Sequence, residues 1–154
     1  NIIDQSTPDS FMPDTFDDKD PRRAIERFYF AYRAFTAGPD RLLEARGLGR
    51  VHHRILYFIG RNPGISVGAL IDALGVSKQA LNAPLRELIE RDLIRAETSP
   101  EDRRVRQLSL SAHGQALEAQ LTEIQTDLLG RAFADCGGEA TDGWHAVMQR
   151  LAAS

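Results

Sequence analysis

The chain of 154 residues is long enough to bury one sizeable hydrophobic core, so we expect a single domain rather than two. Its hydrophobic fraction of 42% and charged fraction of 27% are ordinary for a soluble globular protein. No apolar run approaches the roughly 20 residues of a membrane-spanning helix, and no signal peptide is visible. The single cysteine, Cys136, excludes an intramolecular disulfide and a multi-cysteine zinc site. These features favour a cytoplasmic protein.

The acidic charge is concentrated at the start of the chain. Residues 1–20 hold six aspartates and one lysine, a net charge of −5, which leaves +2 for residues 21–154 of the total of −3. Their composition predicts a loosely ordered acidic arm. Of the 19 cationic residues, 17 are arginines, the side chain best suited to bidentate contacts with phosphates and base edges. Codon bias in a GC-rich genome would give the same excess.

Two helices are predicted in the first part of the chain. The first spans about residues 21–37, with an apolar stripe that ends before Gly38-Pro39. A short helical piece over residues 40–46 follows. The second helix spans residues 51–61 and is stopped by Asn62-Pro63-Gly64.

A helix-turn-helix is predicted next. Ser66 is a suitable N-cap for a helix over residues 67–74, and Gly75 is placed to end it. Ser77 caps a second helix, over about residues 78–91. The short turn between them, which contains glycine, is typical of DNA-binding helix-turn-helix units.

The remaining elements are a hairpin and two helices. Residues 94–98 and 105–110 predict two short strands, joined by a polar tip that ends in two arginines. Ser111 caps a long helix over about residues 112–134, and a final helix carries apolar residues at spacings of three and four over 144–151. The expected fold is therefore mainly α with a small β-hairpin. The apolar stripes at 25–35, 117–128 and 144–151 predict a buried helical dimer interface.

One face of the second helix-turn-helix helix carries chemistry suited to reading DNA. Leucines cluster on its other side, as they also would in any amphipathic surface helix. Amide side chains pair bidentately with adenine and cationic ones with guanine, and the N-terminal part of such a helix usually enters the major groove. Helix starts bind phosphate. The predicted DNA-binding residues in the two helices are Ser66, Ser77, Lys78, Gln79, Asn82 and Arg86.

The hairpin tip is the second candidate contact. Arg103 and Arg104 are predicted to bind DNA, because an arginine at such a tip can enter a narrow minor groove. Asp102 would repel phosphate, so we expect it to pair with one arginine and stabilise the tip while the other faces DNA. The sequence leaves open which arginine does which, and a solvated turn with an ordinary surface ion pair is the alternative.

Several stretches resemble the MarR family of bacterial transcription regulators. They are residues 75–79 (Gly-Val-Ser-Lys-Gln), residues 90–94 (Glu-Arg-Asp-Leu-Ile) and, most specifically, the hairpin tip followed by Leu108-Ser109-Leu110-Ser111 and Gly114. The tip is similar to the family's wing signature: Asp102 and Arg104 fill its Asp-x-Arg part, and Ser111 stands where threonine is usual. The resemblance covers about residues 22–152.

The resemblance implies one domain over residues 21–154. Its winged helix-turn-helix would span about 51–110, flanked by dimerisation helices at about 21–37 and 112–153. It implies a homodimer that binds pseudo-palindromic double-stranded operators and a pocket for a small aromatic or phenolic effector. The side chains that would line such a pocket, none of them assigned individually, are Tyr29, Tyr32, Arg33, His53 and Arg54.

Pro84 departs from what a recognition helix needs. It lies inside the second helix-turn-helix helix, where proline removes a backbone hydrogen bond and clashes with the carbonyl of Ala80. Either the helix kinks, or its C-terminal half is re-aimed, which makes Arg86 a less secure contact than Lys78 or Asn82. A kink without consequence for DNA reading is the alternative.

Catalytic and metal-binding motifs are missing from the sequence. His52 and His53 are adjacent and point about 100° apart on a helix, so they are poorly placed to share a metal. Cys136 has no nearby cation that would lower its pKa, which argues against a thiol sensor. We therefore expect neither an enzyme nor a cofactor. The leading hypothesis is a sequence-specific, homodimeric DNA-binding regulator, a repressor released by a small ligand; the alternative is a winged-helix protein-interaction module that does not read DNA.

Overall fold

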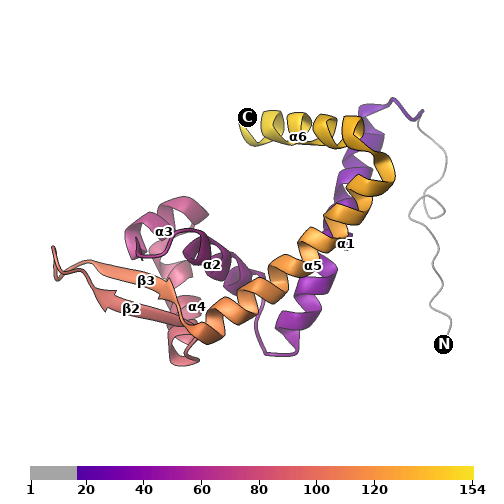
Figure 1. Cartoon of the computed structure of the whole chain (residues 1–154). Coiled ribbons are helices and arrows are strands. Elements are labelled where there is room, and N and C mark those ends of the chain that lie inside the picture. The colour runs from indigo at the N-terminus through magenta and orange to yellow at the C-terminus, as the bar shows by residue number, and fades with distance from the viewer. Residues whose placement is uncertain (1–16) are drawn as a thin grey trace. The chain divides into compact units, whose positions relative to one another are not determined.

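The computed structural model describes residues 17–154, so most of the acidic arm lies outside the described residues. The chain divides into two units, residues 1–37 and residues 38–154, which are described separately. The mainly helical fold with a small antiparallel sheet confirms the expected fold class (Figure 1). Its elements are α1 (Pro21–Glu44), α2 (Arg50–Arg61), β1 (Ile65–Ser66), α3 (Val67–Leu74), α4 (Lys78–Glu90), β2 (Ile94–Thr98), β3 (Arg106–Leu110), α5 (Ala112–Cys136) and α6 (Gly138–Ala152).

The predicted break at Gly38-Pro39 is wrong. Both residues lie inside α1, which continues to Glu44. Proline removes a backbone hydrogen bond and its ring crowds the carbonyl four residues back, but tertiary packing holds the helix here, because Pro39 is buried and Leu43 is fully buried. Gly38 allows this close approach, since a Cβ there would lie 2.6 Å from the side chain of Ile124 in α5.

The end of α1, at Glu44, is set by the turn that follows it. Gly47 adopts a left-handed φ of 69°, its N–H donates to the carbonyl of Glu44, and the N–H of Leu48 donates to the carbonyl of Leu43, both at 2.9 Å. This pair of bonds is a Schellman motif, and the buried Leu48 adds its usual apolar contact. Gly47 therefore ends α1, and the predicted helical piece over residues 40–46 is largely its last part.

The helix-turn-helix forms as the sequence predicts. Ser66 and Ser77 cap α3 and α4, and Gly75 ends α3 in the left-handed conformation with φ of 64°. α4 continues through Pro84 as one helix. The reason is burial, because Leu81, Leu85 and Leu88 each expose 5% or less and hold α4 on both sides of the proline. Packing of an apolar face outweighs a local propensity of about 3 kcal/mol.

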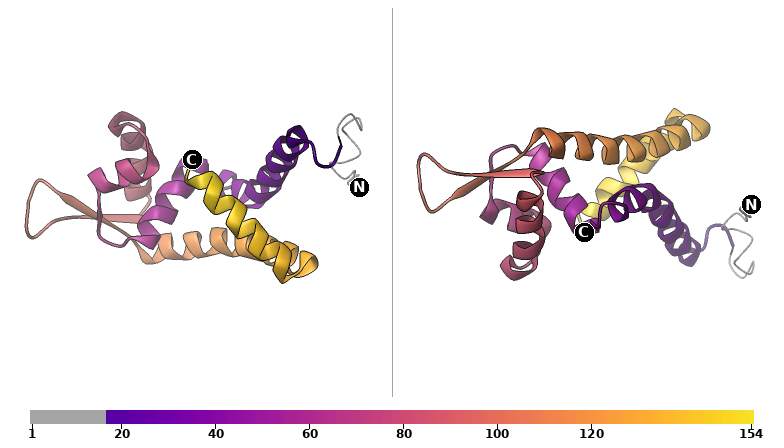
Figure 2. Two further views of the ribbon diagram at one scale, coloured as in Figure 1. Left: turned by 90° about the horizontal axis from the view of Figure 1, so that it is seen from above. Right: turned by 90° about the horizontal axis from the view of Figure 1, so that it is seen from below.

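The sheet has one strand more than expected. Its order is β1-β3-β2, antiparallel throughout, with Ile94 opposite Leu110 and Ile65 opposite Leu108 at either side of β3. β1 contains only two residues, too short for any alternating pattern to predict it. It joins the start of α3 to the hairpin strand β3, and the β2–β3 hairpin extends beyond helices α2 to α4 (Figure 1, Figure 2).

One leucine- and isoleucine-rich core lies under the helix-turn-helix, the sheet and the start of α5. Ser111 caps α5 and its hydroxyl also donates to the carbonyl of Asp92. Gly114 lies so close to the preceding turn that a Cβ there would be 1.9 Å from the carbonyl oxygen of Leu93. The Leu-Ser…Gly part of the wing signature is therefore structural: it fixes α5 to the base of the hairpin.

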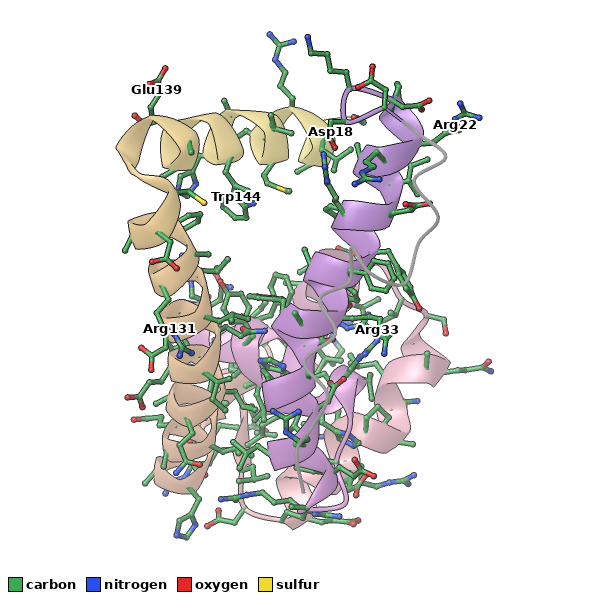
Figure 3. All side chains as sticks on the ribbon, turned by 90° about the vertical axis from the view of Figure 1, so that its right-hand side faces the viewer. Asp18, Arg22, Arg33, Arg131, Glu139 and Trp144 are labelled. Carbon is green, nitrogen blue, oxygen red and sulfur yellow. The ribbon has the colours of Figure 1, made fainter. Side chains whose placement is uncertain are left out.

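The apolar stripe of α5 is divided between two environments. Leu117 and Leu121 are buried in the chain's own core, so the expectation that the whole stripe 117–128 forms a dimer interface is wrong for these two residues. α6 turns back from the end of α5 (Figure 2). Trp144 lies on the α5 side of α6, with its ring 5.1 Å from that of Phe133, and Glu139 lies on the opposite face (Figure 3).

Two helical segments keep large apolar side chains exposed. On α6, Val147 exposes 62% and Leu151 54% of its surface. In the unit of residues 1–37, the N-terminal part of α1 is held at its start by ion pairs of Asp18 with Arg27 and Asp20 with Arg22. The apolar residues exposed along that part are Ile25, Phe28, Tyr29 and Tyr32.

Candidate nucleic-acid interface

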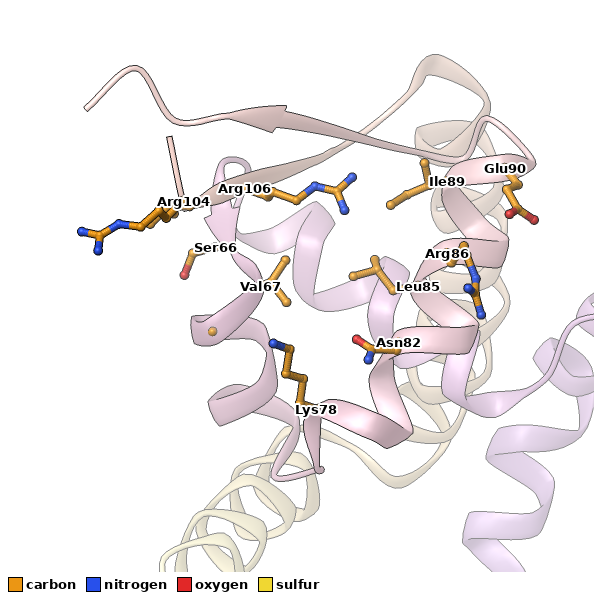
Figure 4. A pocket seen from close by; sticks show the side chains of 12 residues that line it. Ser66, Val67, Lys78, Asn82, Leu85, Arg86, Ile89, Glu90, Arg104 and Arg106 are labelled. Carbon is orange, nitrogen blue, oxygen red and sulfur yellow. The ribbon is translucent and has the colours of Figure 1, made fainter. Parts of the chain in front are cut away.

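An open groove with a volume of about 630 Å³ lies between α3, α4 and the start of β3 (Figure 4). Five of the eight predicted DNA-binding residues line it, namely Ser66, Lys78, Asn82, Arg86 and Arg104. Val67, Leu85 and Ile89 give it an apolar floor, and Gly68, Glu90, Val105 and Arg106 complete its lining. Ser77, Gln79 and Arg103 are exposed but lie outside this lining.

The groove wall on α4 follows directly from helical spacing. Lys78, Asn82, Arg86 and Glu90 recur every fourth residue, which places them along one side of a helix. Figure 4 shows the first three as a row along the wall formed by α4. The structure keeps Arg86 on the same wall as Asn82, so Pro84 does not turn it away from the groove. The row offers, in order, an ammonium, an amide, a guanidinium and a carboxylate.

The two capping serines, Ser66 and Ser77, have a structural role that leaves the proton of each hydroxyl available for a further hydrogen bond. The Oγ of Ser66 accepts from the N–H of Ala69, and the Oγ of Ser77 accepts from the N–H of Ala80, both at 3.1 Å. A hydroxyl also has one proton to donate. Each serine therefore caps its helix and retains a donor at a helix N-terminus, where backbone dipoles favour an anion.

The wing tip contains the ion pair that the sequence predicts, and the structure identifies the partner. Oδ1 of Asp102 accepts from the backbone N–H of Arg104 at 3.0 Å and from its Nε at 3.2 Å. The backbone bond first, and the side-chain bond second, hold the pKa of Asp102 below its usual range. The carbonyl of Asp102 also accepts from the N–H of Val105 at 3.0 Å. Asp102 thus closes the tip around Arg104.

The other tip arginine is differently placed. Within residues 17–154, Arg103 makes no hydrogen bond or ion pair, and it is exposed. Arg104 keeps 90% of its side chain exposed despite its pair with Asp102, and points away from the floor of the groove (Figure 4). Both guanidinium groups are therefore accessible to an anionic partner.

Two charged groove residues were missed by the sequence analysis. Arg106, the first residue of β3, points into the groove across from α4 (Figure 4). Its signal was present, because it lies two residues before the buried Leu108 and so shares that face of the strand. Glu90 continues the row on α4 and adds a carboxylate to the lining of the groove. Its fourth-residue spacing from Arg86 was the available signal.

The histidines and the cysteine are dispersed in the described part of the chain. No group of three metal-ligating side chains occurs there, and no described helix is long and apolar enough to cross a membrane. His113 approaches Asp92 at 3.5 Å, His145 packs against Trp144, and Cys136 is exposed at the end of α5.

The residues considered for an effector pocket fall in two units. Tyr29, Tyr32 and Arg33 belong to residues 1–37, whereas His53 and Arg54 belong to residues 38–154. In the second unit, burial lowers the pKa of the half-buried His53, and the charges of Glu118 and Asp40 oppose that shift. These residues stay candidates without an assigned role.

Comparisons with known proteins agree with this geometry. A model described as MarR family matches residues 46–105. The HTH-type transcriptional regulator PetP of Rhodobacter capsulatus is 42% identical over 134 residues, which cover 87% of this chain and 81% of PetP. The structure of FabT from Streptococcus pneumoniae in complex with DNA is similar with a TM-score of 0.79, at 16% identity over 87% of this chain and 96% of FabT. MarR itself gives a TM-score of 0.67 at 24% identity over 90% and 92%. The structural likenesses show the winged-helix fold, and the identity to PetP shows that this chain belongs to the MarR family of transcriptional regulators.

Proposed function

We propose that this transcriptional regulator is a homodimeric repressor that reads a pseudo-palindromic operator through α4 and holds the duplex with its wing. The observation that carries the proposal is the row Lys78–Asn82–Arg86 on the open wall of α4, faced by Arg106 from β3. Cationic and amide side chains at these spacings are the groups that recognise guanine and adenine edges in the major groove.

The groove residues divide into base readers and phosphate binders. Asn82 pairs with an adenine and Arg86 or Lys78 with a guanine, because these side chains match the donor and acceptor pattern of those bases. Ser66 and Ser77 donate to phosphates at the starts of α3 and α4. Gln79, on the exposed first turn of α4, is a further candidate for an adenine contact.

The wing contributes affinity rather than base preference. Asp102 holds Arg104 at the tip, and Arg103 beside it is the tip arginine that makes no hydrogen bond or ion pair with residues 17–154. We assign Arg103 to the minor groove, where a narrow A·T-rich tract concentrates negative potential, and Arg104 to the adjacent phosphates. The DNA complex of FabT supports a duplex as the partner of this fold.

Dimerisation follows from the exposed apolar helices. Val147 and Leu151 on α6, and Phe28 and Tyr32 on α1, are large apolar side chains at helical spacing that expose about half of their surface or more in the single chain. A second copy covering them removes that exposure. A twofold dimer presents two copies of α4, which is why the operator is pseudo-palindromic. We further propose a small aromatic or phenolic effector that releases the operator, and a cytoplasmic location.

The test is direct DNA selection followed by binding. Purified full-length protein is incubated with random duplexes, the bound sequences are determined, and affinity for the consensus is measured by fluorescence anisotropy at several salt concentrations. The proposal predicts a palindromic consensus and a log–log salt slope of about −0.9 per phosphate contacted. A dimer that selects no sequence and shows no salt-dependent binding would refute DNA reading and favour a protein-interaction module.

A palindromic consensus would support the dimer, and sedimentation of the protein alone checks it independently. The unliganded protein is expected to sediment as two chains. A monomer at micromolar concentration would contradict the dimer while leaving DNA reading to the selection experiment. Val147→Ser on α6 is expected to shift the equilibrium towards monomer, whereas Gln149→Ser, at an exposed position about 200° further round the same helix, serves as the control.

A further inference from the structure

A ring of hydrogen bonds ties α4 to the turn that ends α1, outside the groove. The N–H of Gly49 donates to Nδ1 of His52 at 3.0 Å, so the neutral imidazole carries its proton on Nε2 and donates it to Oε2 of Glu87 at 2.9 Å. The other carboxylate oxygen of Glu87 accepts from Nη2 of Arg91 at 2.8 Å. Nη1 of Arg91 donates in turn to the carbonyl of Arg46, just beyond the end of α1.

The contact of Arg91 suits the C-terminal end of a helix. The last carbonyls of a helix lack intrahelical partners and carry partial negative charge, so a guanidinium there satisfies an acceptor and complements the helix dipole. Arg91 also lies over Gly47, where a Cβ would meet Nη2 at 3.5 Å. His52 meanwhile lies in the first turn of α2, so Arg91, the C-cap of α4, contacts the end of α1, and Glu87 within α4 contacts the start of α2.

The second half of α4 is held by these contacts in addition to its buried leucines. Pro84 has no N–H, so the carbonyl of Ala80 lacks its bond from the residue four positions on, and the two halves of α4 are joined by one backbone bond fewer. Arg86 and Glu87 both lie beyond the proline. The side-chain hydrogen bond from His52, aided by the charge of Arg91 and opposed by burial, holds the pKa of Glu87 below its usual range, so this carboxylate is charged at neutral pH.

We propose that Glu87 and Arg91 are positioning residues that, through His52 and the carbonyl of Arg46, fix the second half of α4 and therefore Arg86 to the end of α1. The inference rests on the proposed reading of DNA by α4. It makes the turn 45–49 and the reading face of α4 one body, so a displacement of that turn changes where Arg86 points.

A double-mutant cycle tests the action through Arg86. Glu87→Gln and Arg91→Lys keep side-chain size, and Arg91→Lys keeps charge but removes the fork that contacts Glu87 and Arg46 together. Each is expected to weaken consensus binding on the order of tenfold in the wild-type background and less than about twofold when combined with Arg86→Ala. Glu123→Gln and Arg131→Lys, which make the same changes on the exposed side of α5, serve as matched controls.

Amide hydrogen exchange of the free full-length protein supplies a readout that does not need DNA. Glu87→Gln is expected to speed exchange both at the end of α4 and in residues 46–48, with the controls unchanged and the far-ultraviolet circular dichroism of all variants the same. Exchange that stays at the wild-type rate in residues 46–48 would overturn the ring as a positioning device. If the Glu87 and Arg91 variants weaken DNA binding equally in the wild-type and Arg86→Ala backgrounds, the ring does not act through Arg86. A wild-type protein that binds no DNA would refute the proposed function, and the exchange experiment would still test the ring.

Discussion

The recognition helix and the wing tip both present cations to the same partner, but they are held in place by different forces. The reading row of α4 is fixed from behind by Leu81, Leu85 and Leu88, all in the core. The tip has no such core: it is closed by local bonds to Asp102, and its two arginines are exposed. A helix fixed by burial can hold side chains in register with bases, whereas a tip closed by exposed polar bonds tolerates movement and suits contacts that carry no register. The comparison supports the proposed division of roles, in which α4 supplies specificity and the wing supplies affinity.

Removing the support of α4 is expected to have the largest effect. Leu88→Ala deletes a fully buried side chain and is expected to lower the free energy of unfolding by about 2–5 kcal/mol, because both the apolar transfer and the remaining cavity count against the folded state. Urea denaturation followed by circular dichroism measures it. Arg103→Ala at the tip serves as the contrast and is expected to leave the midpoint unchanged; equal effects would remove the distinction between the two regions.

The base of the wing, unlike its tip, is fixed by packing. Gly114→Ala places a Cβ 1.9 Å from the carbonyl oxygen of Leu93, so the backbone must move, at a cost of about 3 kcal/mol. Gly130→Ala, on the same helix with nothing near its Cβ, is the matched control and is expected to raise stability by about 0.5–1 kcal/mol. Thermal melts measure both variants. If the two melting temperatures shift in the same direction, the close approach at Gly114 does not constrain the base of the wing.

At the tip the predicted effect concerns binding, not folding. Asp102→Asn keeps the side chain's shape but removes the charge that holds Arg104, so affinity for any duplex is expected to fall a few-fold with little change in melting temperature. Anisotropy with consensus and scrambled duplexes checks it. A decrease confined to the consensus would assign the tip a part in sequence reading.

The smallest expected effect is the pH dependence of stability that the half-buried His53 causes. Because burial lowers the pKa of His53 in the folded state, the unfolded chain binds the proton more readily, and stability is expected to fall as pH drops below the ordinary value of 6.5. His53→Gln should flatten the profile between pH 7 and pH 5. The lowered pKa values of Asp102 and Glu87 place their titration below this window. Identical slopes for wild type and His53→Gln would contradict the assignment.

The same contrast explains what the sequence predicted and what it missed. Caps such as Ser66 and Gly75, and the alternation around Leu108, are local signals, and they placed α3, α4 and the hairpin correctly. The error at Gly38-Pro39 arose because packing against α5 overrode a local preference. Pairing between residues far apart in the sequence has no local signal. This is why β1, which pairs with β3, was missed. It is also why the hydrogen bond of Glu87 with His52, 35 positions earlier, was not predicted.

The candidate site was predicted mainly on its helix. The fourth-residue spacing from Lys78 to Arg86 is a sequence property, and the structure brings those side chains to one wall. The partner of Asp102 required coordinates, because Arg103 and Arg104 are chemically identical and differ only in the path of the backbone. Arg106 enters the site only through the register of β3 beside α4.

The most direct test of the division between α4 and the wing is the salt dependence of binding to consensus and scrambled duplexes by two variants. Asn82→Ala is expected to reduce the binding free-energy difference between the consensus and the scrambled duplex by about 1–3 kcal/mol. The salt slope is expected to stay unchanged. The double change Arg103→Ala with Arg104→Ala is expected to weaken both duplexes alike and to make the slope shallower by about 1 for each phosphate that the tip no longer binds. The reverse assignment, with the ratio changed by the tip and the slope by Asn82, would contradict the account.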